Sequence, residues 1–387
     1  MELKIGNISA IELANTYGTP IYVYNQQIII ERIKQLKDAF PNTKLCYAVK
    51  ANSNIEILKV IAEQGLGADC SNRVEISLAQ KAGFNLKKSL YTGVNPTNED
   101  LKAALESGIT MNIDDITIFK RLLTFGTPEK ISFRINPGFG KGKFPGITVG
   151  GHGTKFGMNE SLATEAYRQA KDLGIKEFGI HMMTGSCVLY NDYFTELTLA
   201  IQDIAKRIES SVGIRFSFID IGGGLGVPYE PHEKPINLKQ IGENVLREYN
   251  HNAQLALEPG RFIVAESGTL LTKVTTLKNK YIGVDAGMST LLRPALYNAY
   301  HPILLANNTE ADFTQEANVV GPICENTDFF AKNRAMPTVK ESDILAIQIV
   351  GAYGFCMCSS YNGILKPAEV LVDGNQHRLI REKECLH

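Results

Sequence analysis

Two patterns of apolar positions alternate along the first two thirds of the chain. Short continuous apolar runs are typical of buried strands. Between them lie longer stretches, such as IEILKVIAEQG and DLKAALESG, whose apolar residues recur three and four positions apart as in amphipathic helices. The predicted strands are KLCYAVKA (44–51), LGADC (66–70), SLYTG (89–93), ITMNID (109–114), KISFRINPG (130–138), FGIHMMTG (178–185), FSFIDIGG (216–223) and QLALEPG (254–260).

Strands that alternate with helices predict a parallel sheet, and eight such units predict an α/β fold with a closed (β/α)8 TIM barrel. An open, doubly wound sheet is the alternative, and the count of eight favours the barrel. A helix at about 8–17 and a short strand at 20–24 precede these units. The segment 138–157 is long and rich in glycine, which is more typical of a functional loop than of disorder.

The pattern changes after about residue 262, where strands follow one another with few helices between them. These later strands are FIVAESGTLLTKVTTLK (262–278), YIGVDAG (281–287), DILAIQIVGAYG (343–354), AEVLVDG (368–374) and QHRLI (376–380). We therefore expect two domains. One is a barrel over 25–262, and the other is an all-β domain made of 1–24 and 263–387, which the N-terminal strand joins.

Composition and charge exclude several partners for this chain of 387 residues. Lys and Arg number 40 and Asp and Glu number 41, so the balance gives no electrostatic reason to expect nucleic acid or an anionic membrane. No apolar run reaches the length of a spanning helix, and the N-terminus does not resemble a secretory signal. The seven cysteines are scattered and include one CxC, at Cys356 and Cys358, without further ligands nearby. We expect a cytoplasmic protein with reduced thiols and no metal.

Polar residues stand at the carboxyl ends of most predicted barrel strands, where the reactive groups of such barrels lie. Lys50, Asp69, His181 and Glu258 occupy such positions, as does the glycine run 222–224. We therefore expect these groups to share one pocket.

Three of these groups indicate a chemistry. Burial of the charged form of Lys50 costs free energy, which favours a neutral nucleophilic amine, although a surface lysine is the alternative. The run GGGLG (222–226) leaves backbone N–H groups open to a phosphate, and a plain tight turn is the alternative. Glu258 in EPGR could keep a pyridine nitrogen protonated, or it could simply pair with Arg261.

Together these motifs resemble one family in order and spacing. The matching stretches, from about Thr19 to Ile380, are YAVKAN, INPGF, TKFGM, GIHMMTGS, GGGLGVPY, EPGRF, VDAGM, RPALY, CEN and GAYGF. The chain resembles the diaminopimelate decarboxylases, which belong with alanine racemase and ornithine decarboxylase among the fold type III enzymes that use pyridoxal 5'-phosphate. The resemblance implies decarboxylation of meso-2,6-diaminopimelate to L-lysine and CO2, the last step of lysine biosynthesis.

The resemblance also implies roles for individual residues. Lys50 would hold the cofactor, and Cys324 would act as the acid. The implied cofactor contacts are Asp69, His181, Met183, Ser186, Gly223, Gly224, Glu258, Gly260, Arg261, Tyr353 and Tyr361. The implied substrate contacts are Arg261, Arg293, Tyr297, Glu325 and Tyr353. In this family Cys324 and Glu325 would come from a partner subunit, which implies a homodimer with shared active sites.

The substrate explains why two arginines and a glutamate would be needed. One end of diaminopimelate keeps its carboxylate, which Arg261 and Arg293 could grip as bidentate forks, and its ammonium group, which Glu325 could bind. Diamines without that carboxylate would match two arginines poorly.

The sequence departs from the family pattern H-x-H-x-G-S, because Met183 replaces the second histidine, which stacks on the cofactor ring in relatives. A thioether can still pack on a ring, but it cannot titrate. This position therefore leaves other functions open. They are a decarboxylase for another carboxylated diamine, such as carboxynorspermidine or a siderophore precursor, a catalytically impaired cofactor-binding homologue, and an amino-acid racemase, against which the CEN and RPALY motifs weigh.

Overall fold

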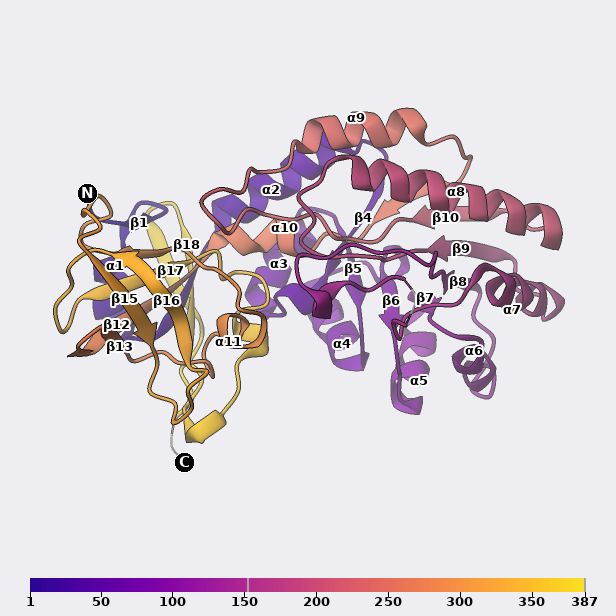
Figure 1. Ribbon diagram of the computed structural model, residues 1–387. Helices are drawn as coiled ribbons and strands as arrows, with labels where there is room; N and C mark the ends of the chain where they lie inside the picture. Colours follow the sequence, from indigo (N-terminus) through magenta and orange to yellow (C-terminus); the bar gives the residue numbers. More distant parts are fainter. Residues whose placement is uncertain (152, 386–387) are drawn as a thin grey trace. The chain divides into compact units, whose positions relative to one another are not determined.

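Eight parallel strands close into a barrel in the computed structural model, which describes residues 1–151 and 153–385 (Figure 1). They follow one another in chain order around the ring, and the last strand pairs with the first. The expected α/β barrel is confirmed. Its strands are β4 (Lys44–Ala48), β5 (Gly67–Cys70), β6 (Leu90–Gly93), β7 (Thr110–Ile113), β8 (Lys130–Arg134), β9 (Glu177–His181), β10 (Phe216–Asp220) and β11 (Gln254–Leu257).

A helix follows each barrel strand. Several of these helices begin where an Asn, Thr or Asp side chain accepts hydrogen bonds from the first turn, as Asn72 and Thr97 do. The helices are α2 (Gln26–Ala39) before the barrel, then α3 (Ile55–Glu63), α4 (Arg73–Ala82), α5 (Asn98–Ser107), α6 (Ile116–Leu122), α7 (Glu160–Asp172), α8 (Asp192–Val212), α9 (Leu238–Glu248) and α10 (Arg261–Val264). Short 3-10 turns are η1 (Val49–Ala51), η2 (Leu86–Lys88) and η3 (Pro145–Ile147).

The rest of the chain is built on a mixed nine-stranded sheet. The N-terminal strand β3 (Ile21–Asn25) lies between β12 and β18 in this sheet, which confirms that it joins the later strands. The other strands are β12 (Gly268–Lys278), β13 (Tyr281–Val284), β14 (Ile303–Leu305), β15 (Gln315–Val320), β16 (Phe329–Met336), β17 (Ile344–Gln348), β18 (Ala368–Asp373) and β19 (Gln376–Arg381). The remaining elements are β1 (Lys4–Ile5), β2 (Ile8–Ser9), α1 (Ala10–Tyr17), α11 (Arg293–Tyr297), and the 3-10 turns η4 (Ala265–Ser267), η5 (Phe355–Met357) and η6 (Tyr361–Gly363).

The chain divides into two compact units. The barrel unit consists of Arg32–Val227 and Lys234–Phe262, and the β-rich unit consists of Met1–Glu31, Pro228–Glu233 and Ile263–His387. The short segment Pro228–Glu233 therefore groups with strands that lie far from it in the sequence.

Two predicted strands are shorter than the sequence suggested. Residues 261–267 form α10 and η4, so that strand begins only at Gly268. A short apolar run such as FIVA fits a helix as well as a strand, which is why its pattern misled the prediction. The segment 343–354 is extended only as far as Gln348, because Ile349 adopts a φ of 61° and turns the backbone out of the sheet.

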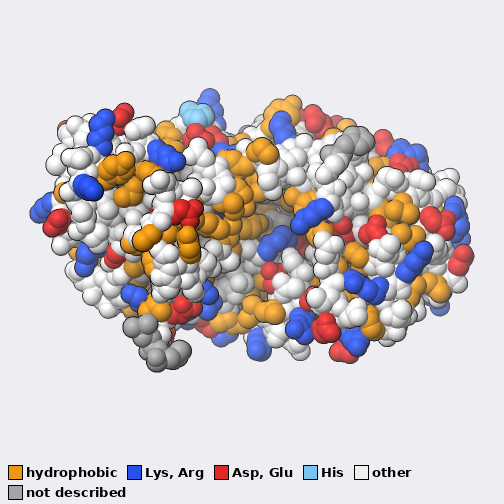
Figure 2. Space-filling view, turned by 60° about the horizontal axis from the view of Figure 1, so that its bottom comes forward, with side chains coloured by type: hydrophobic (Ala, Val, Ile, Leu, Met, Phe, Trp, Pro, Cys, Tyr) orange, Lys and Arg blue, Asp and Glu red, His pale blue; other side chains and the backbone are white. Residues whose placement is uncertain are grey.

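Charges of both signs are spread over the surface. Acidic and basic side chains are interspersed on the face that Figure 2 displays, in line with a formal net charge of −1. Within the described ranges, the structure contains no helix with the length and apolar character needed to cross a bilayer.

The interior of the barrel is closely packed around Phe218 on β10. Phe218 is buried in one cluster with Cys46, Leu90 and Ala256, which come from three other barrel strands. Gly179 on β9 leaves room for this ring, because a Cβ atom at position 179 would collide with it.

We expect Gly179→Ala to lower the free energy of unfolding by about 1–3 kcal/mol, because the added methyl group overpacks the barrel interior. Chemical denaturation followed by circular dichroism measures the change. Gly283→Ala on β13 is the matched control, since a Cβ atom there would meet Thr276 at an ordinary distance of 3.4 Å. Equal stabilities of the two variants would contradict this account of the packing.

Candidate active site

Lys50 and Asp69 form an ion pair at the carboxyl ends of two neighbouring barrel strands. Lys50 lies in η1, directly after β4, and its Nζ atom is 2.5 Å from Oδ2 of Asp69 on β5. Asp69 is completely buried, whereas the side chain of Lys50 is 41 % exposed. The sequence left a buried amine and a surface lysine as alternatives, and the exposure of the side chain fits the second. The η1 turn carries Lys50 beyond the end of the strand, where its amine meets the carboxylate of Asp69.

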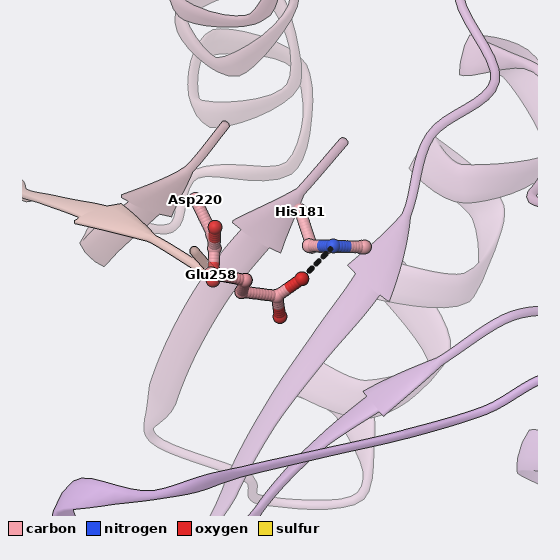
Figure 3. Close-up of side chains that lie close together, drawn as sticks. All are labelled: His181, Asp220 and Glu258. Atoms are coloured by element: carbon pink, nitrogen blue, oxygen red, sulfur yellow. Dashed lines mark hydrogen bonds and ion pairs between the residues drawn. The ribbon is translucent and has the colours of Figure 1, made fainter. Parts of the chain in front are cut away.

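A second polar group lies at the ends of β9, β10 and β11, where Figure 3 shows His181, Asp220 and Glu258 side by side. His181 is the last residue of β9, Asp220 is the last residue of β10, and Glu258 directly follows β11. Nε2 of His181 lies 3.2 Å from Oε2 of Glu258, and all three side chains are buried. Thr92 on β6 supports the other oxygen of Glu258 at 3.5 Å.

Burial and the charges of the neighbouring groups shift the pKa values of His181, Asp220 and Glu258 in different directions. Burial alone would raise the pKa of Glu258, but the charge and hydrogen bond of His181 outweigh it and lower that pKa to about 2. Burial lowers the pKa of His181, yet the neighbouring carboxylates of Glu258 and Asp220 raise it overall. Burial and the charge of Glu258 raise the pKa of Asp220 to about 8. At neutral pH Glu258 is therefore ionised and Asp220 holds its proton, and the two carboxyl groups make His181 more basic than a free imidazole.

The same three side chains have the donor atoms of a metal site, since their ligand atoms lie within 4.8 Å of one another. A metal ion would need a neutral His181 and an ionised Asp220, because ligands bind in their deprotonated forms. Those are the opposite of the charge states that burial and the neighbouring groups favour. The cluster suits a cationic ring nitrogen facing Glu258 better than a metal ion.

The glycine run after β10 brings bare backbone to the same edge of the barrel. Gly222 and Gly224 have φ values of 72° and 101°, in the left-handed region that favours glycine. A Cβ atom would lie 2.7 Å from the carbonyl oxygen of Met182 at the first position and 2.9 Å from that of Gly185 at the second. Side chains would therefore fill this cradle, whose bare backbone can approach a phosphate closely. The N–H groups of Gly222 and Gly223 donate to Oδ1 of Asp220 and to the sulfur of Met183.

Met183 joins the end of β9 to this glycine run. Its sulfur accepts a hydrogen bond from the backbone N–H of Gly223 at 3.2 Å, and its carbonyl oxygen accepts one from Arg134 at 3.0 Å. Ser186 is half-buried near the loop 138–157, where its carbonyl oxygen accepts from the N–H of Lys143. The methionine therefore links the end of β9 to the glycine run.

Gly260 and Arg261 follow Glu258 where β11 meets β4. A Cβ atom at Gly260 would lie 2.9 Å from that of Ala48 and 3.0 Å from that of Ala51, so only glycine allows this approach. Arg261 begins α10 and is 7 % exposed. The residues around Lys50 and those after Glu258 are thus held against each other.

The β-rich unit holds the other predicted residues in two sets of contacts. Tyr361 donates a hydrogen bond to Oε2 of Glu325 at 2.8 Å, and Thr327 donates one to Oε1 at 2.6 Å. These hydrogen bonds, that of Thr327 first, lower the pKa of Glu325. Glu325 and Tyr361 are exposed, and so is Cys324, which precedes Glu325 in the chain.

Arg293 belongs to the second set and contacts His301 and Tyr229. It is buried at the start of α11, and Tyr297 is half-buried at the end of that helix. Tyr353 is half-buried after β17 with a φ of 56°.

Sequence reasoning missed several polar residues that the structure adds to the barrel cluster. Asp220 supports the glycine run by accepting a hydrogen bond from the N–H of Gly222 at 2.7 Å. Thr92 contacts Glu258 and also accepts a hydrogen bond from Asn112 at 3.1 Å. Asp220, Thr92 and Asn112 all lie in the second half of a predicted strand. A polar residue near the end of an apolar run was therefore the sequence signal that could have identified them.

These residues fit pyridoxal 5'-phosphate. The barrel unit offers an amine on Lys50, a carboxylate held ionised on Glu258, and a glycine cradle. Oδ1 of Asp69 and Nδ1 of His181 are buried without a hydrogen-bond partner among the described residues. Buried polar atoms are rarely left unpaired, which supports a polar ligand beside them.

Comparisons with known proteins agree with this geometry. Residues 26–265 match the family model described as "Pyridoxal-dependent decarboxylase, pyridoxal binding domain". A diaminopimelate decarboxylase of Methanothermobacter thermautotrophicus is 41 % identical, over 99 % of this chain and 93 % of the relative.

Solved structures give the same result. The crystal structure of diaminopimelate decarboxylase from Helicobacter pylori complexed with L-lysine has a TM-score of 0.91 at 36 % identity, covering 97 % of this chain and 96 % of that chain. That of diaminopimelate decarboxylase from M. jannaschii with L-lysine has a TM-score of 0.92 at 30 % identity, covering 99 % and 94 %.

The raised pKa of Asp220 predicts a pH-dependent stability. The folded chain holds a proton on Asp220 that the unfolded chain releases above about pH 4. The stability contributed by this proton is present below that pH and is lost as the pH rises towards 8. Asp220→Asn does not titrate and still accepts from Gly222. The wild type should therefore lose stability relative to this variant between about pH 5 and pH 8.

Thermal unfolding at both pH values measures this difference. Asp203→Asn on α8 is the control, because Asp203 is exposed. Parallel pH dependence of the wild type and Asp220→Asn would contradict a protonated Asp220.

Proposed function

Because the chain belongs to the pyridoxal-dependent decarboxylase family, and within it to the diaminopimelate decarboxylases, we propose that it decarboxylates meso-2,6-diaminopimelate to L-lysine and CO2. This reaction is the last step of lysine biosynthesis. The observation that carries the proposal is the ionised Glu258, held by His181, at the same barrel edge as Lys50 and the glycine cradle.

Pyridoxal 5'-phosphate is the cofactor, and when bound it supplies a protonated ring that withdraws the electrons left by the departing carboxylate. Lys50 would hold it covalently, and Glu258 would accept a hydrogen bond from its ring nitrogen. Gly223 and Gly224 would line the phosphate site, where the N–H of Gly223 would exchange the sulfur of Met183 for a phosphate oxygen. The remaining proposed contacts are Asp69, His181, Met183, Ser186, Gly260, Arg261, Tyr353 and Tyr361.

Asp69 prepares the amine of Lys50 for this role. Burial and the nearby Glu258 raise the pKa of Asp69, although Lys50 opposes the shift. Oδ2 of Asp69 lies 2.5 Å from Nζ, and a carboxylate at this distance stabilises the ammonium form of a lysine. Asp69 would therefore hold and orient the Lys50 side chain until the cofactor binds.

Cys324 would complete the reaction as the acid. The bond between the α-carbon and its carboxylate breaks, CO2 leaves, and the thiol of Cys324 delivers a proton to the same carbon. The thiolate then regains a proton from solvent, so one proton is consumed for each CO2 released.

The end of the substrate that does not react would be bound by charge. Arg261 and Arg293 would grip its carboxylate, Glu325 would bind its ammonium group, and Tyr297 and Tyr353 would line the site. These assignments explain why an acid with two amino-acid ends is preferred over a simple diamine.

A homodimer would place Cys324 and Glu325 of one chain in the active site of the other. Their exposure, together with that of Tyr361, supports this arrangement, because catalytic groups need shielding from water that a partner subunit would supply. We place the barrel domain at 25–262 and the β-rich domain at 1–24 and 263–387. We also place the enzyme in the cytoplasm, since its relatives are named for a biosynthetic reaction.

The first test offers the purified enzyme, with cofactor, several carboxylated diamines and measures CO2. We expect meso-diaminopimelate to release CO2 and L-lysine in equal amounts, and Lys50→Ala to release neither. Lys59→Ala on α3 is the matched control, because Lys59 is exposed and pairs with Glu56 one turn earlier in the same helix. Borohydride should attach the cofactor to the peptide that contains Lys50.

A different outcome would identify a different enzyme. Release of CO2 from carboxynorspermidine but not from diaminopimelate would overturn the substrate while leaving the reaction class intact. Cofactor attached to another lysine would overturn the role of Lys50.

Met183→His tests the departure from the family motif. We expect the imidazole to raise kcat about fivefold, because one added hydrogen bond contributes about 1 kcal/mol. Met183→Leu keeps the apolar volume without the sulfur and should leave kcat close to that of the wild type. Equal kcat values for all three proteins, measured by CO2 release at saturating cofactor, would show that Met183 is no handicap.

A further inference from the structure

Arg293 is held on two sides inside the β-rich unit. It is the first residue of α11, and its side chain is among the largest fully buried ones, at 2 % exposure. Its Nη1 atom lies 2.8 Å from Nε2 of His301, and its guanidinium carbon lies 4.5 Å from the centre of the Tyr229 ring. One edge and one face of the guanidinium group are therefore occupied.

The direction of the hydrogen bond determines the state of His301. An arginine only donates, so Nε2 of His301 must be the acceptor. Nδ1 lies 2.9 Å from the carbonyl oxygen of Gln348 on β17 and must therefore carry the proton. These two contacts select one neutral tautomer, because a proton on Nε2 would point at the guanidinium group.

The surroundings keep this imidazole in place. His301 is completely buried, and the ring of Tyr229 meets it edge-on at 5.3 Å. Arg334 on β16 donates to the backbone carbonyl oxygen of His301 at 2.5 Å. The contacts with Arg334, Tyr229 and the carbonyl group of Gln348 are all compatible with Nε2 accepting from Arg293.

We propose that His301 is a positioning residue for substrate selection, because its neutral Nε2 fixes the Arg293 guanidinium that grips the unreacting carboxylate. The inference rests on the role of Arg293 in the proposed function. A neutral acceptor orients the guanidinium without adding a negative charge of its own, so it does not compete with the substrate carboxylate. Tyr229 supports the same orientation from the face of the guanidinium plane.

The test compares variants that keep or remove the acceptor. His301→Phe keeps a ring but accepts no hydrogen bond, and we expect it to raise KM for meso-diaminopimelate about tenfold with kcat within about twofold. His301→Gln offers an oxygen to Arg293 and an N–H to Gln348, and it should recover most of the affinity. His377→Phe on β19 is the matched control, because His377 bonds to Tyr17 instead and should leave KM unchanged.

Inhibition by the product gives a second readout. L-lysine keeps the carboxylate of the unreacting end, whereas 1,5-diaminopentane lacks it. In His301→Phe the inhibition constant of L-lysine should rise with KM, and that of 1,5-diaminopentane should not. A rise for both inhibitors would show a general distortion of the site and would overturn the proposal.

Further variants separate this inference from the function it rests on. If Arg293→Met leaves KM unchanged, the proposed role of Arg293 is wrong. If Arg293→Met raises KM but His301→Phe does not, only the positioning role of His301 is wrong. If His301→Gln does not recover the affinity, the role of His301 as a hydrogen-bond acceptor is wrong.

Tyr229→Leu is the alternative test if His301→Phe does not fold, because it removes the other support of Arg293. It must raise KM with kcat retained, and an unchanged KM would overturn the proposal.

Discussion

Closure of the barrel between β11 and β4 is the constraint on which the site depends. Parallel strands in a closed ring send all their carboxyl ends to one edge, so residues that are far apart in the sequence must meet there. Lys50 follows the first strand of the ring and Glu258 follows the last. Gly260 allows the backbone after β11 to approach Ala48 and Ala51 closely, because any side chain there would press on both. The closed barrel thus brings the amine of Lys50, the carboxylate of Glu258 and the glycine run to the same edge.

This closure concentrates carboxylates in a small buried volume, where they cannot all be ionised. Three carboxyl groups are stabilised here in different ways. The charge and hydrogen bond of His181 lower the pKa of Glu258 and keep it ionised, and Asp69 forms an ion pair with Lys50. Asp220 stays neutral and accepts a hydrogen bond from the backbone of Gly222. One carboxylate is therefore charged at the position where a cationic ring nitrogen would need it, and the others do not compete for that nitrogen.

Local sequence pattern was sufficient for the barrel, since the eight strands are short apolar runs and polar residues stand at or just after the ends of most of them. The sequence pattern failed where a tertiary contact determines the backbone conformation or the charge state of a residue. The run FIVA after Arg261 is as compatible with a helix as with a strand, and Ile349 ends β17 through a backbone turn that no pattern marks. Asp220 looked like an ordinary strand residue because its charge state is set by Glu258 and His181, which come from other strands. The tautomer of His301 likewise depends on a carbonyl group on β17.

Glu258 and Arg293 show opposite solutions to one electrostatic problem, which is how to hold a buried charge in a fixed direction. Glu258 needs a cationic neighbour, because burial would otherwise protonate the carboxylate and remove the charge that a ring nitrogen requires. Arginine is never deprotonated in this way, so its neighbour need not be charged and has only to fix its direction. A carboxylate at the position of His301 would hold the guanidinium equally well but would also neutralise it. The neutral imidazole of His301 keeps the attraction for a substrate carboxylate intact. This difference explains why Glu258 is paired with a histidine whose pKa is raised, whereas Arg293 is paired with a histidine that accepts a hydrogen bond.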